Sequence, residues 1–192
     1  MGIAYEDVPN ERRKSGKILN FSQLNGTTAS GLKREAKTQF NVTMTDKEAR
    51  EALRKYKLAY PELAMWKAGV LARAQAEGIT RTRLGLIRDY GMQGSGYLGG
   101  QAPNVVIQGS AGEVMLSAIA RLPEYINGDG TRVCSTIHDE LLLSVPEGSE
   151  ASAKWALESA MVKGFEDVFP EFGNMTKSLV EAKTGKNWHE VK

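Results

Sequence analysis

The residues best suited to chemistry in this chain are His138, Asp139 and Glu140, which follow one another directly. They stand between two apolar, β-rich runs, 132–137 and 141–145, and Pro146 ends the second run. Two such runs joined by a short polar stretch predict a β-hairpin, with the proline confined to its end. A carboxylate at the tip would be held rigidly yet stay accessible, which suits metal binding. A solvated acidic turn has the same composition, so the tripeptide alone leaves both interpretations open.

A second group of candidate residues recurs at steps of four near the start of the chain: Arg13, Lys17, Phe21 and Asn25. Positions four apart stack along one face of an α-helix. The face would carry a guanidinium, an ammonium, an aromatic ring and an amide in order. Arginine and lysine bind phosphate oxygens, and the ring suits a sugar or a base, so the pattern predicts a nucleoside triphosphate site. A solvated basic helix is the plainer alternative.

Together these two groups meet the two requirements of phosphoryl transfer, which are cations for the triphosphate and a carboxylate for the metal ion. The overall charge gives no such signal, since the 192 residues carry a net charge of only +2. Nucleic-acid binding would have to come from local clusters. The single cysteine, Cys134, excludes an internal disulfide, and its place in a strand pattern predicts a buried thiol in a cytoplasmic protein. No apolar run suggests a membrane span.

The first half of the chain has helical patterns. A helix is expected from Glu11 to about Gly26, with Asn10 as its cap. The segment 45–48 is a capping box that opens a second helix, Pro61 interrupts the pattern, and a further helix ends at Gly78. Trp66 on this helix is expected to be core. A short strand pair within 79–88 is followed by glycines at 91–100, which predict a flexible connector and a domain boundary.

The second half combines helices with a small sheet. We expect a helix from a capping box at 110–113 to Leu122, the hairpin, a helix over 149–165 with Trp155 in the core, and a last strand at 179–182. The predicted fold class is α+β: a helical region over 1–92, followed over 93–192 by a small antiparallel sheet with packed helices.

Four segments in order resemble those of family A DNA polymerases. The stretch 12–21, with Arg13, Lys17 and Phe21 in step, resembles motif B, and 137–140 resembles motif C. Between them, 102–111 is similar to the segment that opens a palm helix and touches the primer–template duplex, and 180–188 resembles the C-terminal strand and end of the family. The resemblance runs from about residue 8 to residue 189. It implies that 1–92 belongs to the fingers and 93–192 to a partial palm.

The resemblance also implies a role for each matching residue. Arg13 and Lys17 would hold the deoxynucleoside triphosphate (dNTP), and Phe21 would pack on its sugar. Asn25 would complete the dNTP-binding set, at the position where the family's tyrosine packs by the templating base. Asp139 would bind catalytic Mg²⁺ with Glu140 nearby, so that Asp139, Glu140 and Lys17 form the catalytic set. The DNA contacts would be His138 at the primer terminus and Asn104 and Gln108 at the duplex.

The chain departs from the family pattern in four places. Asn25 replaces a tyrosine, Leu86 and Ile87 replace arginines, and Gly100 stands where arginine is common. The motif A aspartate precedes motif B in the family, and no equivalent lies upstream of residue 12. Arg88-Asp89-Tyr90 resembles motif A only superficially, because it lies downstream of motif B. Two-metal catalysis needs carboxylates that bridge the ions, so the second aspartate is expected from another chain, which would also carry the thumb.

The function expected from these observations is that of a DNA-directed DNA polymerase fragment or split subunit. It would extend a primer on a template with dNTP and magnesium, in a bacterial or phage-infected cytoplasm, and would be inactive without its complementary chain. The alternative from another class is a non-catalytic nucleic-acid-binding remnant. An unrelated triphosphate-binding protein is disfavoured, since the sequence has neither a P-loop nor a glycine-rich dinucleotide fingerprint.

Overall fold

The computed structural model describes residues 7–24, 26–91, 98–126, 128, 130–173 and 179–191. Contacts divide the chain into two compact units, each of them discontinuous in sequence. The first comprises residues 1–81 and 87–106, and the second comprises 82–86 and 107–192. The expected class is confirmed, because helices predominate and two small antiparallel sheets accompany them.

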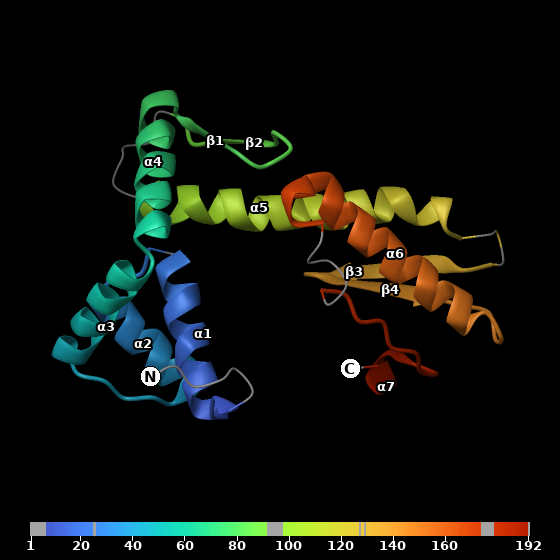
Figure 1. Cartoon of the computed structure of the whole chain (residues 1–192), viewed down its shortest axis with the longest axis horizontal. Coiled ribbons are helices and arrows are strands. Elements are labelled where there is room, and N and C mark those ends of the chain that lie inside the picture. The colour runs from blue at the N-terminus through green and yellow to red at the C-terminus, as the bar shows by residue number, and fades with distance from the viewer. Residues whose placement is uncertain are drawn as a thin grey trace. The chain divides into compact units, whose positions relative to one another are not determined.

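Four helices make up most of the first unit (Figure 1): α1 Asn10–Leu24, α2 Ala29–Phe40, α3 Asp46–Ala59 and α4 Pro61–Glu77. Helices α1, α2 and α3 share a small core formed by Ile18, Leu32, Ala36 and Ala49. A second cluster joins Val70 and Ala74 of α4 to Ala102, with Trp66 packed against it as expected. Apolar residues at helical spacing therefore account for both cores.

The local signals at the helix ends agree with the sequence. Thr45 and Glu48 form the predicted capping box, in which each residue bonds the backbone N–H of the other. Pro61 occupies the first turn of α4, and Gly78 ends that helix with a φ of 71°. Helix α2 was not predicted, although Thr28 caps it and Asn41 ends it in the left-handed region.

The hairpin expected after Gly78 consists of β1 Ile79–Arg81 and β2 Ile87–Asp89, which pair antiparallel. Glycine-rich residues 91–100 were expected to be a flexible connector. Residues 92–97 lie outside the described part of the chain, but Gly99 and Gly100 belong to helix α5, Leu98–Arg121. Glycine has a poor helix propensity, but Leu98 and Ala102 are buried in this first part of α5, and their packing favours the early start of the helix.

The predicted capping box at Ser110–Glu113 is wrong, because both residues lie inside α5. Glu113 is buried, and its carboxylate accepts hydrogen bonds from the Thr82 hydroxyl and from the Leu84 and Leu86 amides, the last two at 2.9 and 3.4 Å. The Ser110 hydroxyl accepts from the Arg83 amide at 2.9 Å. Both side chains therefore anchor the turn 82–86 and cap no helix.

Helices cover the second sheet in the second unit. Strands β3 Arg132–Ile137 and β4 Glu140–Ser144 form the predicted hairpin, and α6 Glu150–Val168 runs across it (Figure 1). Met115 and Ala118 of α5 share a core with Leu141 of β4, and Leu157 and Met161 of α6 pack against that core. Two short helices, η3 Leu122–Glu124 and α7 Trp188–Val191, also belong to this unit.

Small residues on α6 let it approach α5 closely. Ala153, Ala156, Ala160 and Gly164 are all buried and recur at helical spacing. A Cβ at Gly164 would lie 2.6 Å from the Ala118 amide nitrogen, so no larger residue fits there without movement of a helix.

Two expectations for the second unit are wrong. Residues 179–182 form no strand, and the Ala182 amide instead donates to a Glu158 carboxylate oxygen at 3.2 Å. Trp155 is 61% exposed, because the face of α6 that packs inward carries the alanines. Its ring lies edge-on to Tyr125 with 5.7 Å between ring centroids.

The expectation that no segment could span a membrane also needs a correction. Gly100–Glu124 is long and apolar enough to cross a bilayer by length and composition. Its polar residues, however, bond to other parts of the same unit: Glu113 to the turn 82–86, and Arg121 to Asp167. We therefore interpret this segment as a packing helix of a folded domain.

Removal of the Glu113 carboxylate should destabilise the fold strongly. Glu113→Ala leaves the Leu84 and Leu86 amides without an acceptor and should lower the free energy of unfolding by about 2–3 kcal/mol. Urea titration followed by circular dichroism measures this change. Glu147→Ala, in an exposed turn, is the control and should shift stability by less than about 0.5 kcal/mol. Equal effects of the two variants would contradict the anchoring role.

The Asp167 carboxylate should make stability depend on pH. Hydrogen bonds from Arg121, and then from Ser117, lower the pKa of Asp167 below its usual value of 3.8. A lowered pKa in the folded state stabilises the protein above that usual value, and the stabilisation is lost as the pH falls through the folded pKa.

Asp167→Asn should therefore cost about 1–2 kcal/mol at neutral pH, and the difference from the unmodified chain should shrink as the pH falls below about 4. Urea midpoints across the acid range measure it. A difference that stays constant with pH would show that the lost ion pair does not account for the effect.

Candidate active site

The acidic tripeptide lies at the tightest point of the β3–β4 hairpin. Ile137 pairs directly with Glu140, so His138 and Asp139 form a two-residue loop and Glu140 is the first residue of β4. His138 has a φ of 55°, in the left-handed region that side chains rarely adopt, although histidine is more tolerant than most. A positive φ at this position suits the twist of two-residue hairpins. The loop is therefore short and its backbone is strained at His138.

This hairpin presents two adjacent carboxylates to solvent. Asp139 and Glu140 are both exposed, and within the described residues neither forms an ion pair. Uncompensated carboxylate oxygens are the ligands that Mg²⁺ prefers, so the chemistry of the pair fits a magnesium ion. The described part of the chain contains no group of three His, Cys, Asp or Glu side chains that could hold a metal. The pair thus fits part of a metal site.

A β-bulge lies on β3 before this turn. Val133 pairs with Leu143 and Ser135 pairs with Leu142, so Cys134 is the extra residue on β3. The prediction of a buried thiol is wrong: Cys134 is exposed, because the bulge breaks the alternation of inward and outward side chains along the strand.

The basic residues of the first unit lie on α1. Lys17 is exposed, whereas Arg13 is half-buried and its Nε donates to the Val8 carbonyl at 3.1 Å. Arg13 and Lys17 are one helical turn apart and therefore share a face. The Phe21 side chain and the whole of Asn25 lie outside the described residues. Of the predicted stripe Arg13, Lys17, Phe21 and Asn25, the structure thus describes the side chains of the two cations. Arg13 already donates to a backbone carbonyl.

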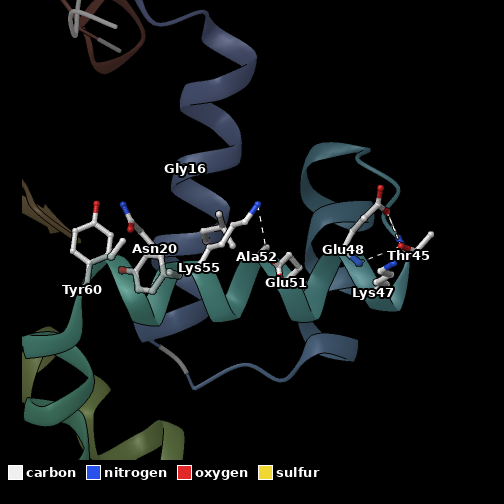
Figure 2. A pocket seen from close by; sticks show the side chains of 12 residues that line it. Gly16, Asn20, Thr45, Lys47, Glu48, Glu51, Ala52, Lys55 and Tyr60 are labelled. Atoms are coloured by element: carbon white, nitrogen blue, oxygen red, sulfur yellow. Dashed lines mark hydrogen bonds and ion pairs between the residues drawn. The ribbon is translucent and has the colours of Figure 1, made fainter. Parts of the chain in front are cut away.

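A pocket of about 900 Å³ lies between α1 and α3. Figure 2 shows Gly16 and Asn20 of α1 on one side of it, and Lys55 of α3 and Tyr60, the residue that follows α3, on the other. Gly16 and Asn20 are each offset by one residue from the predicted stripe, or by roughly 100° around the helix axis. The pocket therefore lies beside the stripe, and Lys17 is not among its lining residues.

Polar contacts that the sequence did not predict hold the C-terminal end of α1. The Ser22 hydroxyl donates to a Glu35 oxygen at 2.5 Å, and the Lys67 ammonium donates to the Gln23 carbonyl. A cation at the last carbonyls of a helix is favoured by the helix dipole. Burial, and then the nearby charge of Lys57, lower the pKa of Lys67. No sequence pattern reveals Lys67, since it follows Trp66 in an otherwise apolar stretch.

Asn104 and Gln108 both lie on α5, four residues apart, and so share one face of that helix. Asn104 is half-buried and Gln108 is exposed. Arg13 and Lys17 belong to the first compact unit, and His138, Asp139 and Glu140 belong to the second. Each unit thus carries one of the two predicted groups of functional residues.

Comparison with known families gives a match over nearly the whole chain. The model for DNA polymerase family A matches residues 1–190. DNA polymerase I of Pseudomonas aeruginosa is 27% identical over 199 residues, which cover 99% of this chain and 20% of that protein. DNA polymerase I A of Arabidopsis thaliana is 31% identical, over 97% of this chain and 18% of that protein. The chain thus spans about a fifth of the length of these relatives.

A phage protein and a solved structure are similar as well. The DNA polymerase of Bacillus phage SP01 is 22% identical over 99% of this chain. The polymerase domain of Pol1 from M. smegmatis, solved with a DNA primer–template and a dNTP, matches 83% of this chain and 28% of its own length. The TM-score is 0.71 at 24% sequence identity, which shows a shared fold.

The positive φ of His138 should affect the stability of variants at this position. Glycine adopts this conformation without the steric cost that a Cβ brings, so His138→Gly should be about 1 kcal/mol more stable than His138→Ala. Both variants lose the imidazole, so their difference isolates the backbone. Chemical unfolding of the two variants side by side measures it. If the alanine variant is as stable as the glycine variant, the turn is not strained at this residue.

Proposed function

Because the chain belongs to DNA polymerase family A, we propose that it supplies the fingers and part of the palm of a DNA-directed DNA polymerase. In this proposal residues 1–92 form the fingers region and residues 93–192 the partial palm. The enzyme extends a primer on a DNA template from dNTP, with Mg²⁺ as its cofactor. The observation that carries the proposal is the exposed, uncompensated pair Asp139 and Glu140 at the hairpin tip.

We assign each functional residue a role in this reaction. Lys17, exposed on α1, binds the triphosphate, and Arg13, one helical turn before it, assists. Phe21 and Asn25 complete the dNTP side of the site. Asp139 binds the metal with Glu140, so these two and Lys17 are the catalytic residues.

We assign the DNA contacts from the positions of the residues as well. His138, next to the acids, contacts the primer terminus, and Asn104 and Gln108 on α5 contact the duplex. Magnesium, when bound, neutralises phosphate charge and lowers the pKa of the attacking hydroxyl. The residues of this chain hold the triphosphate, orient the primer end and supply carboxylate oxygens.

We further propose that a second polymerase chain docks at the acidic hairpin and supplies a further carboxylate and the thumb. Two observations support a covering partner. Asp139 and Glu140 also line a pocket of about 290 Å³ that includes the exposed apolar residues Leu179 and Trp188. Val133 on β3 is 43% exposed, and among the described residues β3 pairs with β4 alone, so that an exposed apolar group lies beside an unpaired strand edge, a combination that favours association. The complex would work in the cytoplasm of a bacterial or phage-infected cell.

Primer extension tests the proposal directly. The chain alone should extend a labelled primer–template undetectably, and addition of a polypeptide with the upstream polymerase segments should restore extension in the presence of Mg²⁺ and dNTP. In the restored mixture Asp139→Ala should lower the rate by at least about a thousandfold, because the metal site loses a ligand. Asp89→Ala is the matched control: its carboxylate accepts from the Gly91 amide, and its loss should leave the rate unchanged.

The outcomes separate the two candidate functions. If Asp139→Ala leaves the restored rate unchanged, the catalytic assignment fails and a non-catalytic DNA-binding remnant takes its place. Lys17→Ala should raise the KM for dNTP by at least about tenfold, since one charge-assisted contact to phosphate is lost. If extension is lost with Asp89→Ala but not with Asp139→Ala, the carboxylate assignment is wrong.

A further inference from the structure

A smaller pocket in the first unit carries charge that the proposed function does not use. It measures about 310 Å³ and lies between α3, α4 and Gln23, near the end of α1. Two lysines line it, Lys57 of α3 and Lys67 of α4, and no carboxylate is among its described lining residues. Within the part of the chain that the structure describes, neither lysine forms an ion pair. The pocket therefore has two ammonium groups and no anion to balance them.

These two lysines favour an anionic ligand. Burial, and then the charge of Lys57, lower the pKa of Lys67, so its ammonium is disfavoured by its surroundings. The Gln23 carbonyl accepts one hydrogen bond from Lys67, which leaves two of the three N–H donors of that ammonium for a ligand. An anionic group between the lysines would relieve their repulsion and accept those hydrogen bonds.

The walls of the pocket are mostly aliphatic. Its aliphatic lining residues come from α3 and α4: Leu53, Leu63, Ala64, Ala68 and Leu71. Such walls bind an apolar side chain, and they present no hydrogen-bonding groups to the edges of a nucleobase. The volume lies at the lower end of the range of small-molecule sites, about 300–1,000 Å³, so it suits a single large side chain. The ligand that combines an apolar side chain with an adjacent carboxylate is the C-terminal residue of a peptide.

A row of cations on α3 leads away from the pocket. Arg50, Arg54 and Lys57 recur at steps of four and three, and they therefore share one face of the helix. All three are exposed, and among the described residues only Arg54 of the three forms an ion pair, with Glu51. Seven residues of helix span about 10 Å, which is about the length of three residues of an extended peptide. The row thus complements acidic residues that precede a C-terminal residue in the pocket.

We propose that this pocket binds the C-terminal residue of a partner protein whose tail is acidic and ends in a large apolar residue. The terminal carboxylate lies between Lys57 and Lys67, and the apolar side chain lies against the aliphatic walls. The preceding acidic residues lie along Arg54 and Arg50. Capture of a C-terminal carboxylate is a recurring mode of peptide recognition, and the complementary charges of the pocket and of α3 select this occupant.

Fluorescence anisotropy with the full chain tests the carboxylate, and the probe is a fluorescein-labelled peptide that ends in Asp-Asp-Asp-Phe. The free acid should bind at least about tenfold more tightly than the same peptide with a C-terminal amide, because the amide carries no charge for the lysines. Replacement of the terminal phenylalanine by serine should weaken binding at least about fivefold, since the buried apolar surface is lost. Both comparisons change only the peptide, so the fold of the chain is not affected.

Substitutions in the chain test the lysines. Lys57→Gln and Lys67→Gln should each weaken binding of the free acid about threefold to tenfold and leave binding of the amide nearly unchanged. Lys55→Gln is the matched control, since Lys55 lies on the same helix, pairs with Glu51 and is absent from this pocket. It should change binding less than about twofold. Circular dichroism and urea midpoints establish that the variants are folded, and Lys57→Gln keeps the test sharp if Lys67→Gln unfolds.

The row of cations is tested with a second peptide. Arg50→Gln should weaken binding of the Asp-Asp-Asp-Phe peptide about twofold to threefold and leave binding of a Ser-Ser-Ser-Phe peptide unchanged, because only the first peptide carries side-chain charges for the row.

Four results would overturn the proposal. They are equal binding of the acid and the amide, no binding of either peptide, an effect of Lys55→Gln as large as that of the pocket variants, and binding of an oligothymidylate that depends on Lys57 and Lys67 when binding of the peptide does not. The last result would identify a nucleic acid as the occupant. None of these measurements uses primer extension, so failure of this proposal leaves the proposed polymerase function standing.

Discussion

The buried carboxylate of Glu113 is the interaction on which the arrangement of the second unit depends. A carboxylate in a protein interior is costly unless donors surround it, and this one accepts from a hydroxyl and two amides of a single turn. The turn 82–86 is separated from Ile107 by twenty residues that belong to the first unit. The hydrogen bonds to Glu113 therefore attach this turn to α5.

The same turn reaches the end of α6. Arg83 donates through Nε to the Val168 carbonyl at 3.2 Å, pairs with Glu171 at 2.5 Å, and lies 5.7 Å from the centroid of the Phe169 ring. A Cβ at Gly109 would meet the Thr82 methyl group at 2.4 Å, so α5 also needs a glycine where the turn approaches it. One short segment thus ties together the two helices that support the acidic hairpin.

Local signals in the sequence predicted much of this fold. The capping box at Thr45, Pro61, Gly78 and both hairpins were predicted correctly, because each depends on a few neighbouring residues. The errors share a cause. Ser110 and Glu113 have the spacing of a cap but bond a turn about thirty residues away, and Trp155 follows a helical pattern whose inward face carries alanines. Tertiary contacts determine the structure at these residues, and such contacts cannot be recognised from the neighbouring sequence.

The residues of the candidate site were likewise predicted only in part from the sequence. Spacing alone found the exposed Asp139 and Glu140 at a hairpin tip and Lys17 on a helix. It did not find Lys67, whose significance depends on a cavity shared with Lys57 on another helix. Nor did it predict the backbone bond of Arg13, which makes the two cations of the stripe unequal. Residue types and periodicity identify candidates, whereas burial and partners decide which side chains remain available to a ligand.

The bulge on β3 has a practical consequence. It turns Cys134 toward solvent, and this is the only cysteine among the 192 residues. A maleimide dye would therefore attach at one defined position, four residues before His138, without any engineered substitution. Quenching or energy transfer from that dye would report the approach of another molecule to the hairpin in real time.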